Sequence, residues 1–357
     1  MSSPTPTNRW SRRGPAVRGG VLALIAAVLF GISTPLVQRF GFGVGAFATA
    51  ALLYLGAAAA GALLRQRVEQ EARILPSDFP RLLAMATAGA VIGPVALAWG
   101  LQRTSATSAS LMLTLEAVFT AVLAWWIYRE TMDRRVRTAM LLLLLGGALL
   151  IVNQGRTGST GLWGLLAVLL ATAAWGLDNT LSRALAERDP GQVVLAKALL
   201  GATATSILAA GFGESLPTPG AALGLFAVGA TGYGLSLRFY LLAQRAFGAA
   251  RTGSIFAFAP FIGAALAVGL GDQSLSWTMA AGSVLMLAGV VLHLAESHGH
   301  EHEHDATEHE HAHRHDDGHH DHIHVPMPPG KHSHRHRHNP VRHVHPHVPD
   351  AHHAHRH

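Results

Sequence analysis

The feature of this sequence that most constrains its fold is a series of ten apolar runs, each about 20 residues long. They lie at residues 17–36, 42–64, 80–101, 106–128, 136–153, 161–182, 192–213, 220–243, 250–270 and 276–295. An apolar helix of about 20 residues matches the thickness of the hydrocarbon core of a bilayer. Polar residues do not alternate with apolar ones inside the runs, which excludes a membrane β-barrel. The sequence therefore predicts an all-α integral membrane protein with ten transmembrane helices.

The distribution of charge predicts the orientation of these helices. Only 13% of the 357 residues are charged, against roughly 25% in a soluble domain. With a cytoplasmic N-terminus, 16 arginines fall on the inside of the membrane and three on the outside. Positive residues collect in cytoplasmic loops. We therefore expect a multi-pass protein of the plasma membrane (a bacterial-type inner membrane), with both termini in the cytoplasm.

The chain also contains an internal repeat with an offset of 142 residues. Gln102-Arg103, Phe119, Glu130 and Gly147 recur as Gln244-Arg245, Phe261, Asp272 and Gly289. Five spans per half is an odd number, so the two halves must have opposite orientations, as in many secondary transporters. The expected organisation is a disordered N-terminus (1–16), two five-helix repeats (17–153 and 161–295) and a disordered His-rich tail (296–357).

Two segments at corresponding places in the repeats resemble a family signature. The first runs from Leu115-Glu116-Ala117-Val118-Phe119 to Arg129-Glu130, and the second from Phe258-Ala259-Pro260-Phe261 to Gly271-Asp272. They resemble the fourth-helix pattern of EamA-type members of the drug/metabolite transporter superfamily, which usually reads Leu-Glu-Pro-Val-Phe and ends in Gly-Glu. Ala117 and Arg129 depart from that pattern. The resemblance covers residues 17–295 and implies solute transport. It leaves the substrate open among amino acids, metabolites, drugs and nucleotide sugars.

Four ionisable residues fall inside the predicted spans at more than two residues from either end: Glu116, Asp178, Lys197 and Arg238. Each costs roughly 2.5–3.5 kcal/mol at the centre of a membrane helix, so each is a functional candidate. Glu116 and Asp178 are predicted to face a central transport cavity, where apolar surroundings favour the protonated carboxyl group and one of them could couple transport to protons. The structural alternative is that Asp178 only pairs with Lys197 or Arg238. Lys197 and Arg238 also have stems long enough to reach the membrane interface.

Trp175, Asn179 and Tyr233 are predicted to line the same cavity, together with the four ionisable residues. Aromatic and amide groups are typical of a pocket for an organic solute. Trp and Tyr also collect at membrane interfaces for reasons of solvation alone, and this interpretation stays open for them.

Histidines alternate with charged residues in the tail, which holds 23 of the 24 histidines. The candidate metal ligands are His300, His302, His304, His309, His311, His313, His315, His332, His334, His336 and His338. Imidazole binds Ni²⁺, Co²⁺ and Zn²⁺, and in an extended chain every second residue lies on one face. With few apolar residues the tail is predicted to be disordered. A charge that responds to pH and drift in a tolerant terminus are the alternatives.

Three functions follow from these patterns. The leading prediction is a secondary active transporter that exports a small organic solute or metabolite and carries a tail that binds or senses divalent metals. The second is an efflux transporter for Ni²⁺, Co²⁺ or Zn²⁺, and the third is a metal-responsive sensor that does not transport. No nucleophile motif or cofactor fingerprint indicates an enzyme. The predicted partners are the bilayer, the solute, metal ions and a second copy of the chain (a homodimer), but not nucleic acid.

Overall fold

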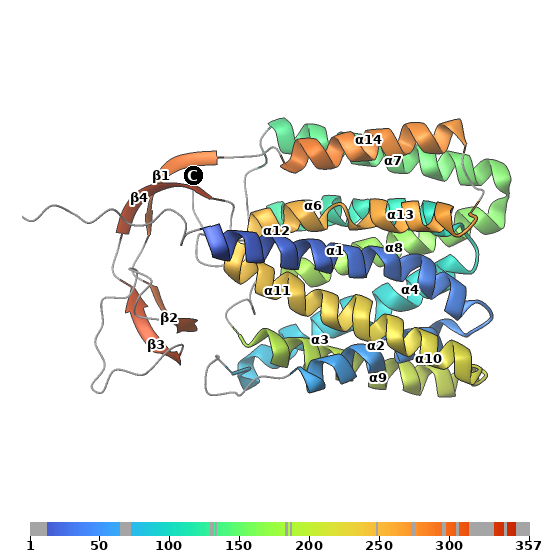
Figure 1. The fold of residues 1–357 in the computed structure, drawn as a ribbon, viewed down its shortest axis with the longest axis horizontal. Coiled ribbons are helices and arrows are strands. Elements are labelled where there is room, and N and C mark those ends of the chain that lie inside the picture. Colours follow the sequence, from blue (N-terminus) through green and yellow to red (C-terminus); the bar gives the residue numbers. More distant parts are fainter. Residues whose placement is uncertain are drawn as a thin grey trace, which may run out of the picture.

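The structure is a computed structural model that describes residues 13–64, 73–128, 132, 134–182, 185, 188–247, 249–272, 276–294, 298–304, 307–313, 332–338 and 341–347. Its body is a bundle of helices that run along one common direction (Figure 1). We name the two ends of the bundle by residues in their loops. The Thr104 end contains the connections after residues 41, 101, 211 and 269, and the Asp78 end contains those before residues 76, 134 and 190.

The elements of the first repeat are α1 (Arg13–Gly41), α2 (Ala46–Leu63), η2 (Pro76–Asp78), α3 (Phe79–Ala86), η3 (Thr87–Ile92), α4 (Gly93–Leu101), α5 (Ala106–Met112), η4 (Leu113–Leu115), α6 (Glu116–Tyr128) and α7 (Arg134–Thr157). Those of the second are α8 (Ser159–Ser182), α9 (Pro190–Gly211), α10 (Pro219–Val228), η6 (Gly229–Leu235), α11 (Ser236–Phe247), α12 (Ala249–Phe256), α13 (Ala259–Gly269) and α14 (Trp277–Leu294).

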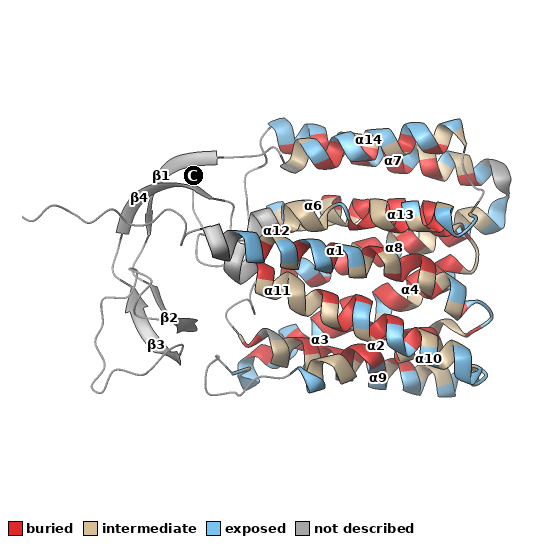
Figure 2. Cartoon of the chain, viewed as in Figure 1, coloured by how far each residue is buried: buried red, intermediate tan, exposed pale blue. Residues whose placement is uncertain are grey.

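The membrane class predicted from the sequence is confirmed. Among the described residues, nine helical stretches are long and apolar enough to cross a bilayer, and a slightly shorter apolar helix, Trp277–His293, follows them. Large apolar side chains such as Leu145, Ile207 and Val284 are exposed on the outside of the bundle, while buried residues gather inside it (Figure 2). Helices that are apolar on all sides are expected where lipid takes the place of water.

Local sequence signals place several helix starts. Ser105 precedes α5, and its Oγ accepts a hydrogen bond from Ser108 N (3.0 Å). Asp189 does the same for α9, where its Oδ1 accepts from Gly191 N (2.8 Å) and Pro190 occupies the first turn. These side chains satisfy amide groups that have no partner within the helix.

Several predicted spans are present but are not single regular helices. The stretch 80–101 contains the π-helical segment η3, and 220–243 contains the π-helical segment η6. The spans 106–128 and 250–270 are broken by η4 and by a turn at residues 257–258. Residues 87 and 229 are 142 positions apart, so these interruptions follow the repeat offset. Periodicity over 20 residues does not reveal a local change of helix type, because π segments depend on tertiary packing.

Equivalent helices of the two repeats pack on each other in opposite directions. A side chain on Gly146 of α7 would lie 2.7 Å from Gly282 O of α14, and one on Gly289 of α14 would lie 2.9 Å from Ala139 O of α7. These contacts make α7 and α14 antiparallel neighbours, as Figure 1 also shows. The equivalent helices α2 and α9 also pack along one another. This arrangement is what an inverted repeat requires.

The structure describes four short stretches of the backbone of the tail. Its described backbone forms β1 (His298–His304), β2 (Thr307–His313), β3 (His332–His338) and β4 (Val341–His347). β1 pairs with β4 and β2 with β3, both antiparallel. Strict alternation of residue types gives each strand two distinct faces. The predicted disorder of the tail as a whole stays a prediction.

Candidate functional site

A chain of polar groups runs from α6 through α8 to α9, in which Asp178 and Lys197 are buried, Glu116 is half-buried and Asn179 is exposed. Asn179 Nδ2 donates a hydrogen bond to Glu116 Oε1 (2.5 Å). The next residue on α8, Asp178, forms an ion pair with the Lys197 ammonium of α9 through Oδ2. Glu116 opens α6 directly after the 3-10 turn η4. Three different spans therefore contribute to the polar site.

Asp178 and Lys197 are buried, with 4% and 9% of their surfaces exposed. A buried ion pair is stable only when the remaining lone pairs and protons also find partners. Asp178 Oδ2 has Lys197, but Asp178 Oδ1 is buried and has no hydrogen-bond partner. An unsatisfied buried polar atom is rare and calls for an explanation. Asp178 Oδ1 is thus a buried acceptor whose hydrogen-bonding capacity is unused.

Gly89, in the π-helical segment η3, lies directly against the Asp178 carboxylate. A side chain on Gly89 would collide with the Asp178 carboxylate, so only glycine leaves that position free. The carbonyl oxygen of Gly89 accepts hydrogen bonds from Tyr54 Oη (2.5 Å) and from Trp175 Nε1 (3.0 Å). A π segment interrupts the regular helical hydrogen-bond ladder and is frequent at functional sites. Here the backbone at Gly89 anchors two aromatic side chains beside the ion pair.

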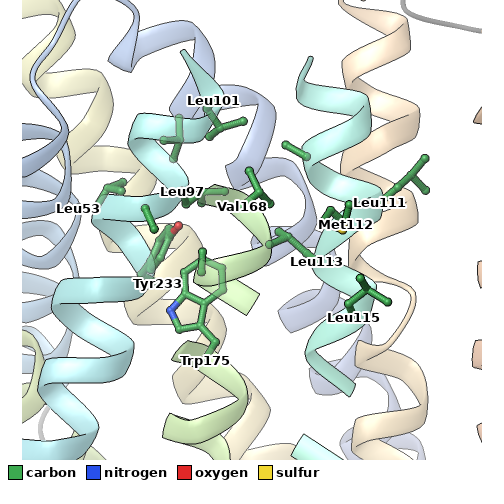
Figure 3. Packing of buried hydrophobic residues seen from close by; sticks show 14 of the residues in the cluster. Leu53, Leu97, Leu101, Leu111, Met112, Leu113, Leu115, Val168, Trp175 and Tyr233 are labelled. Carbon is green, nitrogen blue, oxygen red and sulfur yellow. The ribbon is translucent and has the colours of Figure 1, made fainter. Parts of the chain in front are cut away.

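Aromatic rings surround this point. Phe30 of α1 meets Trp175 edge-on with ring centroids 6.2 Å apart, and Tyr233 of η6 lies 6.1 Å from Phe30 and 5.8 Å from Tyr54. Figure 3 shows the rings of Trp175 and Tyr233 next to each other, close to Leu97 and Val168. Edge-on pairs of this kind are favourable beyond the area that they bury. The aromatic cluster thus forms one wall of the polar site.

The structure brings most of the predicted site residues together. Glu116, Asp178, Asn179 and Lys197 form the polar chain, and Trp175 and Tyr233 lie beside it. Arg238 lies on α11, is half-buried and makes no ion pair with Asp178 among the described residues. The stem of Lys197 is long enough to reach the membrane interface, but its ammonium group stays inside the bundle. It is held there by the ion pair with Asp178.

Sequence reasoning missed two parts of the site and one ion pair outside it. Tyr54 and the carbonyl of Gly89 carried no signal, because a backbone acceptor becomes available only through the local helix type. A second ion pair also went unnoticed: Arg188 Nε lies 2.7 Å from Asp78 Oδ2 at the Asp78 end. In the sequence, Arg188 contributes only to the count of arginines on the cytoplasmic side. A search for an acid in a loop on the same side of the membrane would have found Asp78.

The predicted metal ligands stand apart from this site. The structure describes the backbone of the tail strands but not their side chains, and His315 lies outside the described residues. No group of three or more His, Cys, Asp or Glu occurs among the side chains that the structure describes.

Comparisons with known proteins agree with this architecture. A family model described as "EamA-like transporter family" matches residues 17–153 and 162–295. An "Uncharacterized transporter" of Methanothermobacter thermautotrophicus is 28% identical over 236 residues, which cover 64% of this chain and 68% of the relative. A crystal structure of a protein with 18% identity has a TM-score of 0.56 and covers 78% of this chain and 98% of its own. The chain belongs to the EamA-like transporter family and is a multi-pass membrane transporter.

Proposed function

We propose that the chain is a secondary active exporter of a small organic solute, and that the Asp178–Lys197 pair couples export to protons. The observation that carries the proposal is the buried Asp178 carboxylate, which has one oxygen on Lys197 and the other without a partner. An open acceptor beside a cation supports an exchange of partners, in which proton, solute and Lys197 compete for one carboxylate. The neighbouring aromatic rings favour a solute with an apolar part.

In this mechanism, a donor group of the solute binds the deprotonated Asp178 carboxylate in competition with Lys197. Protonation of Asp178 removes that charge and releases the solute outside. Loss of the proton to the cytoplasm then restores the ion pair with Lys197. Because Asn179 follows Asp178 on α8 and donates to Glu116, a shift of α8 also reaches α6. Glu116 then acts as the second coupling residue.

The test is transport by the full-length protein in liposomes that contain a trapped pH-sensitive dye. A panel of amino acids, cationic drugs, nucleotide sugars and Ni²⁺, Co²⁺ and Zn²⁺ is added one at a time. We expect an organic compound to trigger proton movement, and we expect Asp178→Asn and Glu116→Gln to reduce it to the level of protein-free liposomes. Undiminished proton movement in both variants would end the coupling proposal, and a response to the metal ions alone would favour metal efflux.

The chain offers a matched control for this experiment. Asp78 also pairs with a cation inside the protein, but it lies at the Asp78 end and away from the polar chain. Asp78→Asn is therefore expected to lower stability and to keep proton movement per folded molecule. The predicted location in an inner membrane, with both termini in the cytoplasm, and the predicted homodimer remain predictions.

A second candidate function, binding of divalent metal ions by the tail, is favoured by the strand register. His309 lies opposite His336 and His311 opposite His334 in the β2–β3 pair, and Glu308 lies opposite Arg337. Directly opposite residues share a face of an antiparallel pair. Each strand pair would thus have one face on which histidines of both strands lie. In β2–β3, the other face would place acidic residues of one strand opposite basic residues of the other. Four imidazoles on one face are a donor set for Ni²⁺, Co²⁺ or Zn²⁺.

Calorimetric titration of the full-length protein with Ni²⁺ tests whether the tail binds the metal ion. It also tests whether the pairing of β2 with β3 brings their histidines into one site. Replacement of His334 and His336 by alanine should weaken the site at His309 and His311, although that His-x-His remains intact. The matched control replaces Arg335 and Arg337 by glutamine on the other face and should keep the affinity. If each His-x-His binds independently of its opposite strand, the register plays no part; if no heat is released at neutral pH, the metal function is wrong.

A further inference from the structure

Asp272 joins the ninth span to the fourth at the Thr104 end. It follows α13, and its Oδ2 accepts hydrogen bonds from Thr107 N (2.9 Å) and Thr107 Oγ1 (2.7 Å). Thr107 is the second residue of α5, where the amide groups have no partner within the helix. A carboxylate at this place also interacts favourably with the helix dipole. A loop of the second repeat thereby supplies a cap for a helix of the first.

Among the described residues, the two spans joined by Asp272 pack on each other mainly at this end. α5 packs against α13, and a side chain on Gly263 would lie 2.9 Å from Ser110 Oγ. Beyond their breaks, the other halves take different partners: α6 packs against α8, and α12 packs against α1 and α11. The fourth and ninth spans therefore diverge towards the Asp78 end. Glu116, the first residue of α6, lies where they part.

A second carboxylate makes the same kind of cap in a different setting. Glu214 accepts from Phe47 N (3.2 Å) and Ala48 N (2.7 Å) at the start of α2, which has no side-chain cap of its own. Gly45 lacks the side chain that would collide with the Glu214 carboxylate. However, Glu214 follows α9, and α9 packs along the length of α2. This cap joins helices that stay together, whereas the Asp272 cap joins helices that touch at one end.

We propose that Asp272 is the latch that keeps the Thr104 end of the transporter closed. Its bonds to Thr107 must break before α5 and α13 can separate and expose the polar site from that end. Alternating access requires such a separation between the two repeats. Asp272 is a positioning residue here, because it acts through the start of α5. The inference needs only that the chain is a transporter, and it stands independently of the coupling role of Asp178.

The experiment measures exposure of Ser110, which is fully buried between α5 and α13. The chain contains no cysteine, so Ser110→Cys is a nearly isosteric and unique reporter. The full-length variant is placed in lipid nanodiscs and treated with a water-soluble maleimide. We expect slow labelling in the Ser110→Cys protein and labelling on the order of tenfold faster after Asp272→Ala, because a charged cap is lost. Asp272→Asn should have a smaller effect, since its amide oxygen still accepts from Thr107.

Glu214→Ala is the matched control and should leave the labelling rate unchanged although it removes a comparable cap. Thermal unfolding of each variant separates opening from general destabilisation. Should Asp272→Ala fail to fold, Thr107→Val removes only the Oγ1 bond and should still speed labelling. Equal labelling rates in the Asp272 and Glu214 variants would overturn the latch. Proton coupling is not measured in this assay, so its failure leaves the coupling proposal untouched.

Discussion

At the scale of single residues, the site depends on one unsatisfied hydrogen-bond acceptor and on one position without a side chain. Asp178 keeps one oxygen without a partner, and Gly89 keeps clear the space that the carboxylate occupies. Tyr54 and Trp175 both donate hydrogen bonds to Gly89 O. The backbone at Gly89 therefore positions these two aromatic side chains and also contacts the ion pair. A change of one methyl group at Gly89 must therefore act on charge placement as well as on packing.

Gly89→Ala is predicted to destabilise the protein by about 1–3 kcal/mol, because the added methyl group collides with Asp178. The matched control is Gly155→Ala in α7, where nothing lies within 4 Å of the added group. Alanine there should be neutral or stabilising. Thermal unfolding of both variants in detergent checks this. Equal stability would contradict the close contact at Gly89.

Tyr54→Phe is predicted to cost about 0.5–1.5 kcal/mol, the usual contribution of one hydrogen bond. The phenylalanine ring keeps the edge-on contact with Tyr233, and only the bond to Gly89 O is lost. Solute affinity in the liposome assay should fall less than after Gly89→Ala. A larger loss from Tyr54→Phe would give the hydroxyl group a direct role towards the solute.

At the scale of elements, glycines allow the π segments to touch their neighbours. A side chain on Gly229 of η6 would collide with Leu53 O of α2, and one on Gly56 of α2 would collide with Phe226 O. Close backbone approach through small residues is the main means of helix association in membranes. The interruptions at η3 and η6 therefore depend on a neighbouring helix rather than on their own residues alone.

Gly229→Ala is expected to lower stability by about 1–3 kcal/mol, since the methyl group would push η6 away from α2. Gly220→Ala near the start of α10 is the control, because nothing lies within 4 Å of its added group. The midpoint of thermal unfolding distinguishes the two variants. Similar midpoints would mean that α2 and η6 are not in tight contact.

The sequence predicts a feature of the structure correctly where a single physical requirement determines that feature. Bilayer thickness sets the length of a span, so the ten spans and the family signature around Glu116 could be read from the chain. The partner of Asp178 could not be predicted, because Lys197 and Arg238 are both cationic and only packing places Lys197 beside Asp178. The cap from Asp272 to Thr107 joins residues 165 positions apart and carries no local signal.

At the scale of the whole molecule, the inverted repeat relates the two ends of the bundle. In this conformation the Thr104 end is joined by many hydrogen bonds between elements. Gln38 of α1 donates to Leu101 O (2.7 Å) and Thr104 O (2.8 Å), and Gln102 donates to Val44 O (2.8 Å). These bonds join α1 to the turn between α4 and α5, and that turn to the start of α2. The conformation is thus the one in which the Thr104 end is closed.

The predicted orientation places the Thr104 end outside the cell. A single cysteine at Leu216, which is 95% exposed in the loop after α9, should react with an impermeant maleimide in intact cells. A single cysteine at Leu63, 86% exposed at the Asp78 end of α2, should react only after permeabilisation. The opposite pattern would reverse the topology, and reaction of both positions from outside would contradict the inverted repeat.

The central claim is that Asp178 couples solute movement to protons, and the most direct measurement compares two modes of transport in one variant. In liposomes with the identified solute, Asp178→Asn should still exchange labelled for unlabelled solute, because Trp175, Tyr233 and Lys197 remain in place. It should lose transport driven by a pH gradient, because the amide cannot take up the proton. Gradient-driven transport by Asp178→Asn at the rate of the unaltered protein would contradict the account.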